Sequence, residues 1–202
     1  MATQWLAQTT DGWIVTLDAA GRRRSLPSHI ELDVTGTVSG RDRFRVLEGV
    51  HSGTDGSIAT GSGLLRTSDP HLSAATVRFR NRTGGPTTIA GVVYDKEILI
   101  EYSDGGGVLT VGPFNAVGDP TNPIPTGTHV LQVPDFPHDL GASYSQYGTV
   151  WFRIGTSGDR YLHPGSISAG CATAQGTTWV QIYETIIKRR DTSGNVGNLV
   201  VT

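Results

Sequence analysis

The chain has one cysteine, Cys171, among its 202 residues. A single cysteine can form neither a disulfide within the chain nor a zinc site built from several cysteines, so both are excluded. The sequence also lacks an excess of charge of one sign: 16 basic residues stand against 18 acidic ones, a formal net charge of −2. Charge-driven binding to a nucleic-acid backbone needs concentrated basic residues. We therefore expect no nucleic-acid partner, and we expect the two short basic runs, residues 22–24 and 188–190, to be solvated faces.

Long apolar runs are missing as well. A helix needs about 20 consecutive apolar residues to cross a bilayer, and the longest apolar runs here have only a few. Residues 1–11 lack the basic and apolar regions of a secretory signal peptide. We expect no membrane span and no Sec-type signal.

Glycine and proline, by contrast, are abundant, with 27 and 10 copies. An average protein has roughly 12% of the two together, so this chain has many turns and short elements. Alternation of apolar and polar residues, typical of half-buried strands, occurs in residues 30–34, 43–47 and 76–80. Residues 98–102 are richer in β-branched and aromatic residues and predict a more central strand, which a turn at 103–107 connects to a returning strand at 108–111. With further strands expected at 129–133, 150–154 and 199–201, the sequence predicts a mainly β protein.

One segment has helical periodicity instead. Its apolar residues, spaced as the stripe of an amphipathic helix, are Trp179, Ile182, Tyr183, Ile186 and Ile187. Thr178 and Gln181 have the spacing of a capping box, and residues 188–190 place positive charge where it would offset the helix dipole. The pattern predicts a helix over residues 178–190, the longest in the chain.

Residues 82–88 have the composition of a linker, although a long hairpin loop fits them equally well. We place a domain boundary there. Residues 1–88 then form a β-rich N-terminal region that binds a partner, shields a cleft or completes the sheet of a single domain. Residues 89–202 form a second β domain with one prominent helix.

The most informative stretch surrounds the cysteine. His163 precedes Cys171 by eight positions, and two glycines, a proline and two serines lie between them, which indicates a loop. A thiol enzyme needs a thiolate, a nearby base and N–H donors for the developing oxyanion. We expect Cys171 to be the nucleophile and His163, held as imidazolium beside the thiolate, to be the acid and base. The backbone N–H groups of Gly170 and Cys171 are candidate oxyanion donors, and Ser168 would bond the thiolate or fix the loop.

The same residues also allow a reading without catalysis. His163 could cap a turn, and Cys171 could be an inert buried side chain, which is the commoner role of a lone cysteine.

The motif Ser168-Ala169-Gly170-Cys171 resembles the Ser/Thr-His-Gly-Cys signature of the L,D-transpeptidase (YkuD-like) catalytic domain family, whose upstream histidine is matched by His163. Residues 122–129 are similar to the Thr-Pro-x-Gly-x-aromatic strand entry of that family, and a helix after the cysteine is usual in it. The resemblance covers residues 89–202. Three features depart from it: Ala169 replaces the motif histidine, Thr173 replaces an Arg or Asn, and the spacing from histidine to cysteine is shorter.

The resemblance implies cysteine-dependent acyl transfer on peptidoglycan stem peptides. Cys171 would attack the carbonyl of the L-centre in a diaminopimelate–D-alanine bond, and His163 would protonate the leaving D-alanine. An amine, a free D-amino acid or water would resolve the thioester, giving a transpeptidase, an exchange enzyme or an L,D-carboxypeptidase. No metal or organic cofactor is implied.

The departures make this chain similar to a divergent branch of effectors that contractile secretion systems deliver without a Sec signal. Such a protein acts on the cell wall, in the periplasm or after export, and has an immunity or delivery protein as partner.

Several polar residues are candidates for substrate binding. Tyr144 and Tyr147 could bind a substrate amide, and His138 could line the cleft. Arg153 and Arg160 could pair with a stem-peptide carboxylate, although a surface role fits them equally well. Two other functions stay open: a cell-wall-binding module without catalysis, which the loss of the motif histidine at Ala169 favours, and a thiol peptidase or amidase that acts on another peptide.

Overall fold

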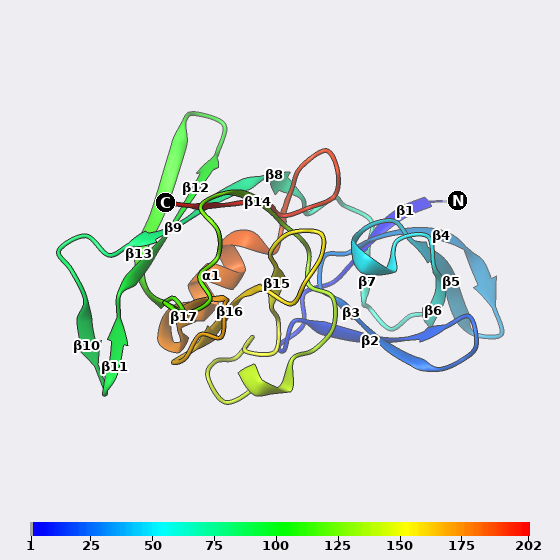
Figure 1. Cartoon of the computed structure of the whole chain (residues 1–202). Coiled ribbons are helices and arrows are strands. Elements are labelled where there is room, and N and C mark those ends of the chain that lie inside the picture. The colour runs from blue at the N-terminus through cyan, green and yellow to red at the C-terminus, as the bar shows by residue number, and fades with distance from the viewer. Residues whose placement is uncertain (1) are drawn as a thin grey trace.

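The computed structural model of the chain describes residues 2–202 and confirms a mainly β protein, with 47% of residues in strands and 8% in helices (Figure 1). Helical structure comprises α1 (Trp179–Ile186) and the short 3-10 turns η1 (Gly49–His51), η2 (Asp139–Gly141) and η3 (Gly176–Thr178). Strands of the N-terminal third are β1 (Ala2–Leu6), β2 (Trp13–Asp18), β3 (Arg23–Pro27), β4 (Glu31–Val38), β5 (Arg41–Val46), β6 (Asp55–Ala59) and β7 (Leu65–Arg66). The later strands are β8 (Leu72–Ser73), β9 (Ala75–Asn81), β10 (Thr87–Ile89), β11 (Val92–Tyr94), β12 (Lys96–Ser103), β13 (Val108–Val117), β14 (Gly127–Leu131), β15 (Phe152–Arg153), β16 (Tyr161–Gly165), β17 (Ala172–Gln175), β18 (Arg189–Arg190) and β19 (Gly197–Val201).

The first sheet has seven strands in the order β3-β2-β6-β5-β4-β1-β7, all antiparallel. β4 and β5 cover the strands predicted at 30–34 and 43–47. Along β5 the buried Phe44 and Val46 alternate with the exposed Arg43 and Arg45, as a strand with one buried face requires.

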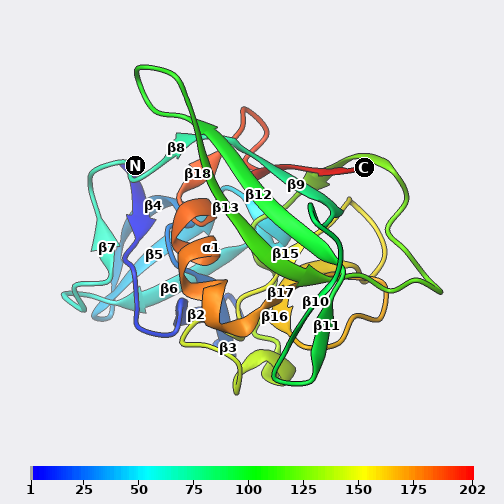
Figure 2. The ribbon, with the colours of Figure 1, turned by 90° about the vertical axis from the view of Figure 1, so that its left-hand side faces the viewer.

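The second sheet has eight strands in the order β14-β19-β9-β12-β13-β17-β16-β15. β12 lies between β9 and β13, so the predicted central strand and its hairpin are confirmed. The two edge strands meet: Leu131 bridges Ile154, and Gln132 N–H donates to the Arg153 carbonyl at 2.9 Å. The sheet therefore closes on itself. The tip of the β12–β13 hairpin and the separate β10–β11 hairpin project in opposite directions (Figures 1 and 2).

The chain passes from the first sheet to the second earlier than the predicted boundary at residues 88 and 89. The first sheet ends with β7 at Arg66, and β9 already pairs with β12 and β19 of the second sheet. The boundary placed between residues 88 and 89 therefore lies too far along the chain, because residues 82–88 form a turn and the start of the β10–β11 hairpin. Buried residues of both sheets, from Leu6 to Val201, also form one hydrophobic cluster.

The predicted helix is shorter than its sequence pattern. α1 buries Trp179, Ile182, Tyr183 and Ile186, as the periodicity predicted. Thr178 does not cap it, because η3 precedes the helix and the Thr178 hydroxyl donates to the Gln175 carbonyl at 2.8 Å. The chain leaves the helix after residue 186 to form β18, which pairs with β8. Within residues 2–202, no helix has the length and apolar content that a bilayer crossing requires.

The basic run at residues 188–190 is not the solvated face that we expected. Arg189 is buried, and its guanidinium lies 3.6 Å from the centre of the Tyr102 ring. Arg190 donates two hydrogen bonds, of 2.7 and 3.0 Å, to the carboxylate of Glu48, which follows β5. Both side chains of this ion pair are at most 6% exposed. It joins the C-terminal part of the chain to the first sheet.

We expect Arg190→Met to lower the free energy of unfolding by about 3–5 kcal/mol, because it removes the arginine that pairs with the buried Glu48 carboxylate. Urea denaturation at neutral pH measures the loss. Arg45→Met is the matched control: Arg45 also pairs with a carboxylate, that of Asp55, but the two side chains are 54% and 58% exposed. Little change is expected there. Equal losses in both variants would contradict this role for the buried pair.

Two buried histidines make the fold sensitive to acid. Burial is the main cause that lowers the pKa of His29 from 6.5 to about 4, and Lys188 and Arg190 lower it further. Burial likewise lowers the pKa of His163 to about 4. Between these values the unfolded chain binds more protons than the folded chain, so stability falls as the pH drops from about 6.5 towards 4.

We expect each of these histidines to cost on the order of 2 kcal/mol of unfolding free energy between about pH 8 and pH 5. His29→Asn should remove about half of this pH dependence, since Asn does not titrate and tolerates left-handed backbone. The backbone at position 29 is left-handed, with φ at 66°. Urea denaturation at the two pH values measures the effect, and an unchanged slope in the variant would contradict it.

Candidate active site

Two neighbouring strands place the candidate residues. β16 and β17 pair in parallel, with Leu162 opposite Ala172 and His163 opposite Thr173. Leu162 and Ala172 point into the hydrophobic core, so the side chains that alternate with them, His163 and Thr173, lie on the other face. Cys171 directly precedes β17 at the same face. His163 is therefore a strand residue rather than a residue of the predicted loop, which is confined to residues 166–171.

The cysteine sulfur lies against the backbone of the segment that leads into β16. Its Sγ accepts a hydrogen bond from the Tyr161 N–H at 3.4 Å and lies 3.9 Å from the Asp159 carbonyl. Burial raises the pKa of the Cys171 thiol, and the Tyr161 N–H and the charge of Arg160 offset this only in part. The resting thiol is protonated at neutral pH.

The hydrogen bonds of His163 define its tautomer. Nδ1 lies 2.9 Å from the Pro164 carbonyl, which can only accept, so Nδ1 carries the proton. Nε2 then accepts from the Thr173 hydroxyl, 3.2 Å away. Because burial lowers the pKa of His163 to about 4, the ring is neutral at pH 7. The expected resting pair of thiolate and imidazolium is therefore wrong: both groups rest uncharged.

Cys171 and His163 nevertheless line the same pocket, which has a volume of about 390 Å³. Tyr144, Trp151 and Asp159 line it too. Two exposed side chains at its rim are apolar, Leu140 at 83% and Ile167 at 79% exposed, and a third, Asp159, carries a carboxylate. The fold thus brings the predicted nucleophile and the predicted base to one cavity with a largely apolar mouth.

A stack of rings holds the imidazole of His163. The Trp151 ring lies between His163 and His138, with both centroid distances at 4.2 Å. Phe136 covers the outer face of His138 at 4.4 Å. The stack fixes the plane of the His163 ring. It also means that His138 supports the pocket from behind rather than lining it as predicted, whereas Trp151 lines the pocket.

The buried Asp135 fixes the far end of this stack. Its carboxylate accepts hydrogen bonds from His138 Nε2 and from the Tyr161 hydroxyl, both at 3.0 Å. Burial is the largest single influence on the pKa of Asp135 and raises it, but these two bonds and the Phe136 N–H together bring the pKa below its ordinary value. Asp135 is therefore a carboxylate at neutral pH, and it orients both His138 and Tyr161.

Ser168 fixes the loop, which is one of its two predicted roles. Its hydroxyl donates to the Cys171 carbonyl at 2.7 Å and accepts from the Cys171 N–H at 3.0 Å. That N–H is therefore engaged in the resting state and is not a free oxyanion donor. The oxyanion role of the Gly170 N–H stays a prediction. Gly170 itself has a φ of 93°, and a Cβ there would lie 2.7 Å from the Asn122 amide nitrogen, so the loop requires glycine.

Both candidate arginines bind backbone instead of the pocket. Arg160 donates to the carbonyls of Gly170, at 2.7 Å, and Asn122, at 3.1 Å. Arg153 donates twice to the Gly158 carbonyl, at 3.1 and 2.8 Å. The expected pairing of these residues with a substrate carboxylate is thus not supported. Arg160 instead holds the loop that carries Cys171.

The two tyrosines that were candidates for substrate binding lie in different places. Tyr144 lines the pocket, with its hydroxyl 3.4 Å from the Ser166 hydroxyl, and stays a candidate for substrate contact. Tyr147 is buried and stacks on Tyr183 of α1 at 4.0 Å. The prediction that Tyr147 binds substrate is therefore wrong, because the residue belongs to the core.

Sequence reasoning missed three residues of the site: Thr173, Trp151 and Asp159. For Thr173 a signal existed, because a residue two places after the cysteine lies on the same face of a strand as the cysteine. Its contact with His163 depends on the pairing of β16 with β17, which the sequence does not reveal.

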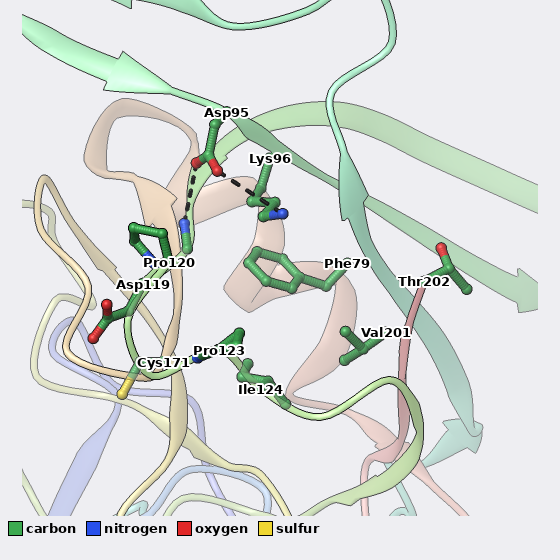
Figure 3. Close-up of a pocket in the computed structure, with 11 residues that line it drawn as sticks. Phe79, Asp95, Lys96, Asp119, Pro120, Pro123, Ile124, Cys171, Val201 and Thr202 are labelled. Atoms are coloured by element: carbon green, nitrogen blue, oxygen red, sulfur yellow. Dashed lines mark hydrogen bonds and ion pairs between the residues drawn. The ribbon is translucent and has the colours of Figure 1, made fainter.

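A second and smaller cavity, of about 100 Å³, also touches Cys171. Phe79, Ile124 and the ion pair of Asp95 with Lys96 lie around it. Figure 3 shows the Cys171 sulfur directed away from Phe79 and Ile124. The thiol chemistry is therefore assigned to the larger pocket. Within residues 2–202, no group of three or more His, Cys, Asp and Glu side chains is arranged to hold a metal ion.

Comparisons with models of known protein families, with curated proteins and with solved structures found no match for this chain. The function is therefore inferred from the site.

We expect iodoacetamide to alkylate Cys171 more slowly at pH 7 than a cysteine in an unstructured peptide, because the raised pKa of the thiol leaves less thiolate. The rate should increase with pH, and the pH of its half-maximal value should lie above that of the peptide. Intact-mass measurement of the adduct over a pH series follows the reaction, and the protein unfolded in urea is the control that should match the peptide. A fast rate that persists at acidic pH would instead reveal a resting thiolate–imidazolium pair.

Proposed function

We propose that the chain is a cysteine-dependent acyltransferase that acts on peptidoglycan stem peptides, with Cys171 as nucleophile and His163 as acid and base. The observation that carries the proposal is that both side chains line one pocket, while Ser168 and Arg160 hold the loop of the nucleophile in place. The resemblance of residues 168–171 to the L,D-transpeptidase signature supplies the substrate class.

The hydrogen bonds of His163 suit a base that becomes an acid. The Pro164 carbonyl accepts from Nδ1 and would stabilise the ring when it gains a second proton at Nε2. The Thr173 hydroxyl, which donates to Nε2 at rest, has another acceptor in the Ile167 carbonyl at 3.3 Å. Rotation of this hydroxyl would release Nε2 to receive the proton of the Cys171 thiol.

The reaction would then proceed in two halves. The proton moves from Sγ to Nε2, Sγ attacks the carbonyl carbon of the stem peptide, and the C–N bond breaks as Nε2 returns the proton to the leaving amine of D-alanine. The thioester on Cys171 is resolved by an amine of a second peptide, by a free D-amino acid or by water. The first two acceptors give transfer or exchange, and water gives an L,D-carboxypeptidase.

A binding module without catalysis is the second candidate. Both ring nitrogens of His163 have protein partners at rest, and Ala169 stands where the related motif has a histidine. A thiol peptidase or amidase for another peptide would use the same two residues, and the largely apolar rim of the pocket favours no particular peptide backbone.

We expect the purified protein to release D-alanine from wall fragments with tetrapeptide stems, or to exchange it for an added D-amino acid. Cys171→Ala should abolish the reaction, and His163→Ala should slow it by about 100-fold or more, the usual contribution of a positioned acid and base. Product analysis by liquid chromatography and mass spectrometry measures both.

His129→Gln is the matched control, because His129 bonds the Pro125 carbonyl outside the pocket and should keep the full rate. Unchanged product with Cys171→Ala would rule out this nucleophile. Binding of wall fragments by all variants without any product would favour the binding module.

A further inference from the structure

The charges around the pocket are unbalanced. Among the described residues that line it, none is a lysine or an arginine, and Asp159 is the one carboxylate. The nearby guanidinium groups of Arg153 and Arg160 are held by backbone carbonyls. Asp159 is exposed, and within residues 2–202 its carboxylate has no hydrogen-bond or salt-bridge partner. The pocket therefore presents one free negative charge.

That charge acts on the reacting sulfur. The backbone carbonyl of Asp159 is 3.9 Å from Sγ, which places the residue beside the point of attack. Burial is the main cause that raises the pKa of the Cys171 thiol, and the charge of the Asp159 carboxylate also raises it. The other side chains at the mouth, Leu140, Tyr144 and Ile167, offer apolar surface. A ligand that matches both features has a flexible alkyl stem and ends in a cation.

We infer that the pocket selects an aliphatic side chain with a terminal ammonium and no carboxylate, and that Asp159 is the specificity-determining residue. The peptide context rests on the proposed function. Stem peptides with lysine or ornithine at the attacked residue satisfy the pocket. Stem peptides with diaminopimelate at that residue do so less well, because its side-chain carboxylate would face Asp159 with no arginine to pair with it. This preference differs from the diaminopimelate substrate that the family resemblance implies.

The first test reads the charge at the sulfur without any peptide. Two methanethiosulfonate reagents of equal chain length, aminoethyl and sulfonatoethyl, form a disulfide with Cys171 and release the same sulfinate. We expect the ratio of their rates, cationic over anionic, to exceed the ratio for glutathione. Asp159→Asn should lower the ratio about fivefold, the effect of one exposed charge pair at close range.

Asp139→Asn is the matched control for the first test. Asp139 is an exposed acid in η2, next to Leu140, but it does not line the pocket. This variant loses the same charge but at a position outside the pocket, so its rate ratio should stay that of the wild type. Equal ratios in the wild type and in Asp159→Asn would overturn the role of Asp159.

The second test measures peptide binding to Cys171→Ala by titration calorimetry. Tetrapeptide stems with lysine, norleucine or diaminopimelate at the third residue are compared. We expect the lysine peptide to bind about fivefold more tightly than the norleucine peptide, and the added Asp159→Asn substitution to remove the difference. The diaminopimelate peptide should bind more weakly than the lysine peptide.

The two tests separate the two claims. If the peptides bind without a preference for lysine, or if Asp159→Asn leaves the preference intact, the inference fails while the proposed function stands. If no stem peptide binds but the reagents show the expected ratio, the proposed substrate is wrong, and the selection of an ammonium group at Asp159 stands.

Discussion

The parallel pairing of β16 with β17 is the constraint on which the candidate site depends. A shift of this register by one residue would turn His163 into the core and Leu162 into the pocket, because successive side chains of a strand point to opposite faces. The register is held by apolar burial on the core side, where Leu162, Ala172 and Ala174 are fully buried. It is held on the pocket side by the bond between Thr173 and His163 and by the Tyr161 N–H on Sγ. The core therefore determines where Cys171 and His163 lie.

Burial also decides the charge state of the site. The thiol and the imidazole lie against carbon-rich surroundings in which either ion is poorly solvated, so the pKa of Cys171 is raised and that of His163 is lowered. The stack of Trp151 on the His163 ring excludes water from the face that the ring would otherwise expose. Both groups therefore rest uncharged, and in the proposed reaction charge would develop only once a substrate is bound. The proton would then move together with the attack on the carbonyl, and neither ion would be populated beforehand.

Alternation of apolar and polar residues predicted β4, β5 and β9. β12 was predicted from its β-branched and aromatic residues instead, and its burial does not alternate, since Glu97 and Ile98 are both buried. β16 shows neither signal, because all five of its residues are buried and two of them are Pro164 and Gly165, so the segment looked like a loop. The prediction that residues 188–190 form a solvated face failed for a related reason. The Arg190 side chain is 6% exposed because it pairs with Glu48, a residue 142 positions away. Cys171 was found because it is the only cysteine of the chain, and His163 because it lies eight positions before Cys171. Their partners were not found, since Thr173, Trp151 and Asp159 acquire their roles only through packing.

These contacts bear on Ala169, which stands where the L,D-transpeptidase signature would have a histidine. In this chain the order of the site comes from three other sources: Ser168 bonds both backbone groups of Cys171, Arg160 bonds the Gly170 carbonyl, and the Trp151 stack holds the His163 ring. A side chain at position 169 is then not required for positioning, and a small one leaves the pocket mouth open beside the sulfur. The short loop between β16 and β17 also orders the backbone around Cys171. With few residues between the two strands, the loop needs glycine at position 170 and the hydrogen bond from Arg160 to the Gly170 carbonyl. Both backbone groups of Cys171 are bonded as a result, through Ser168.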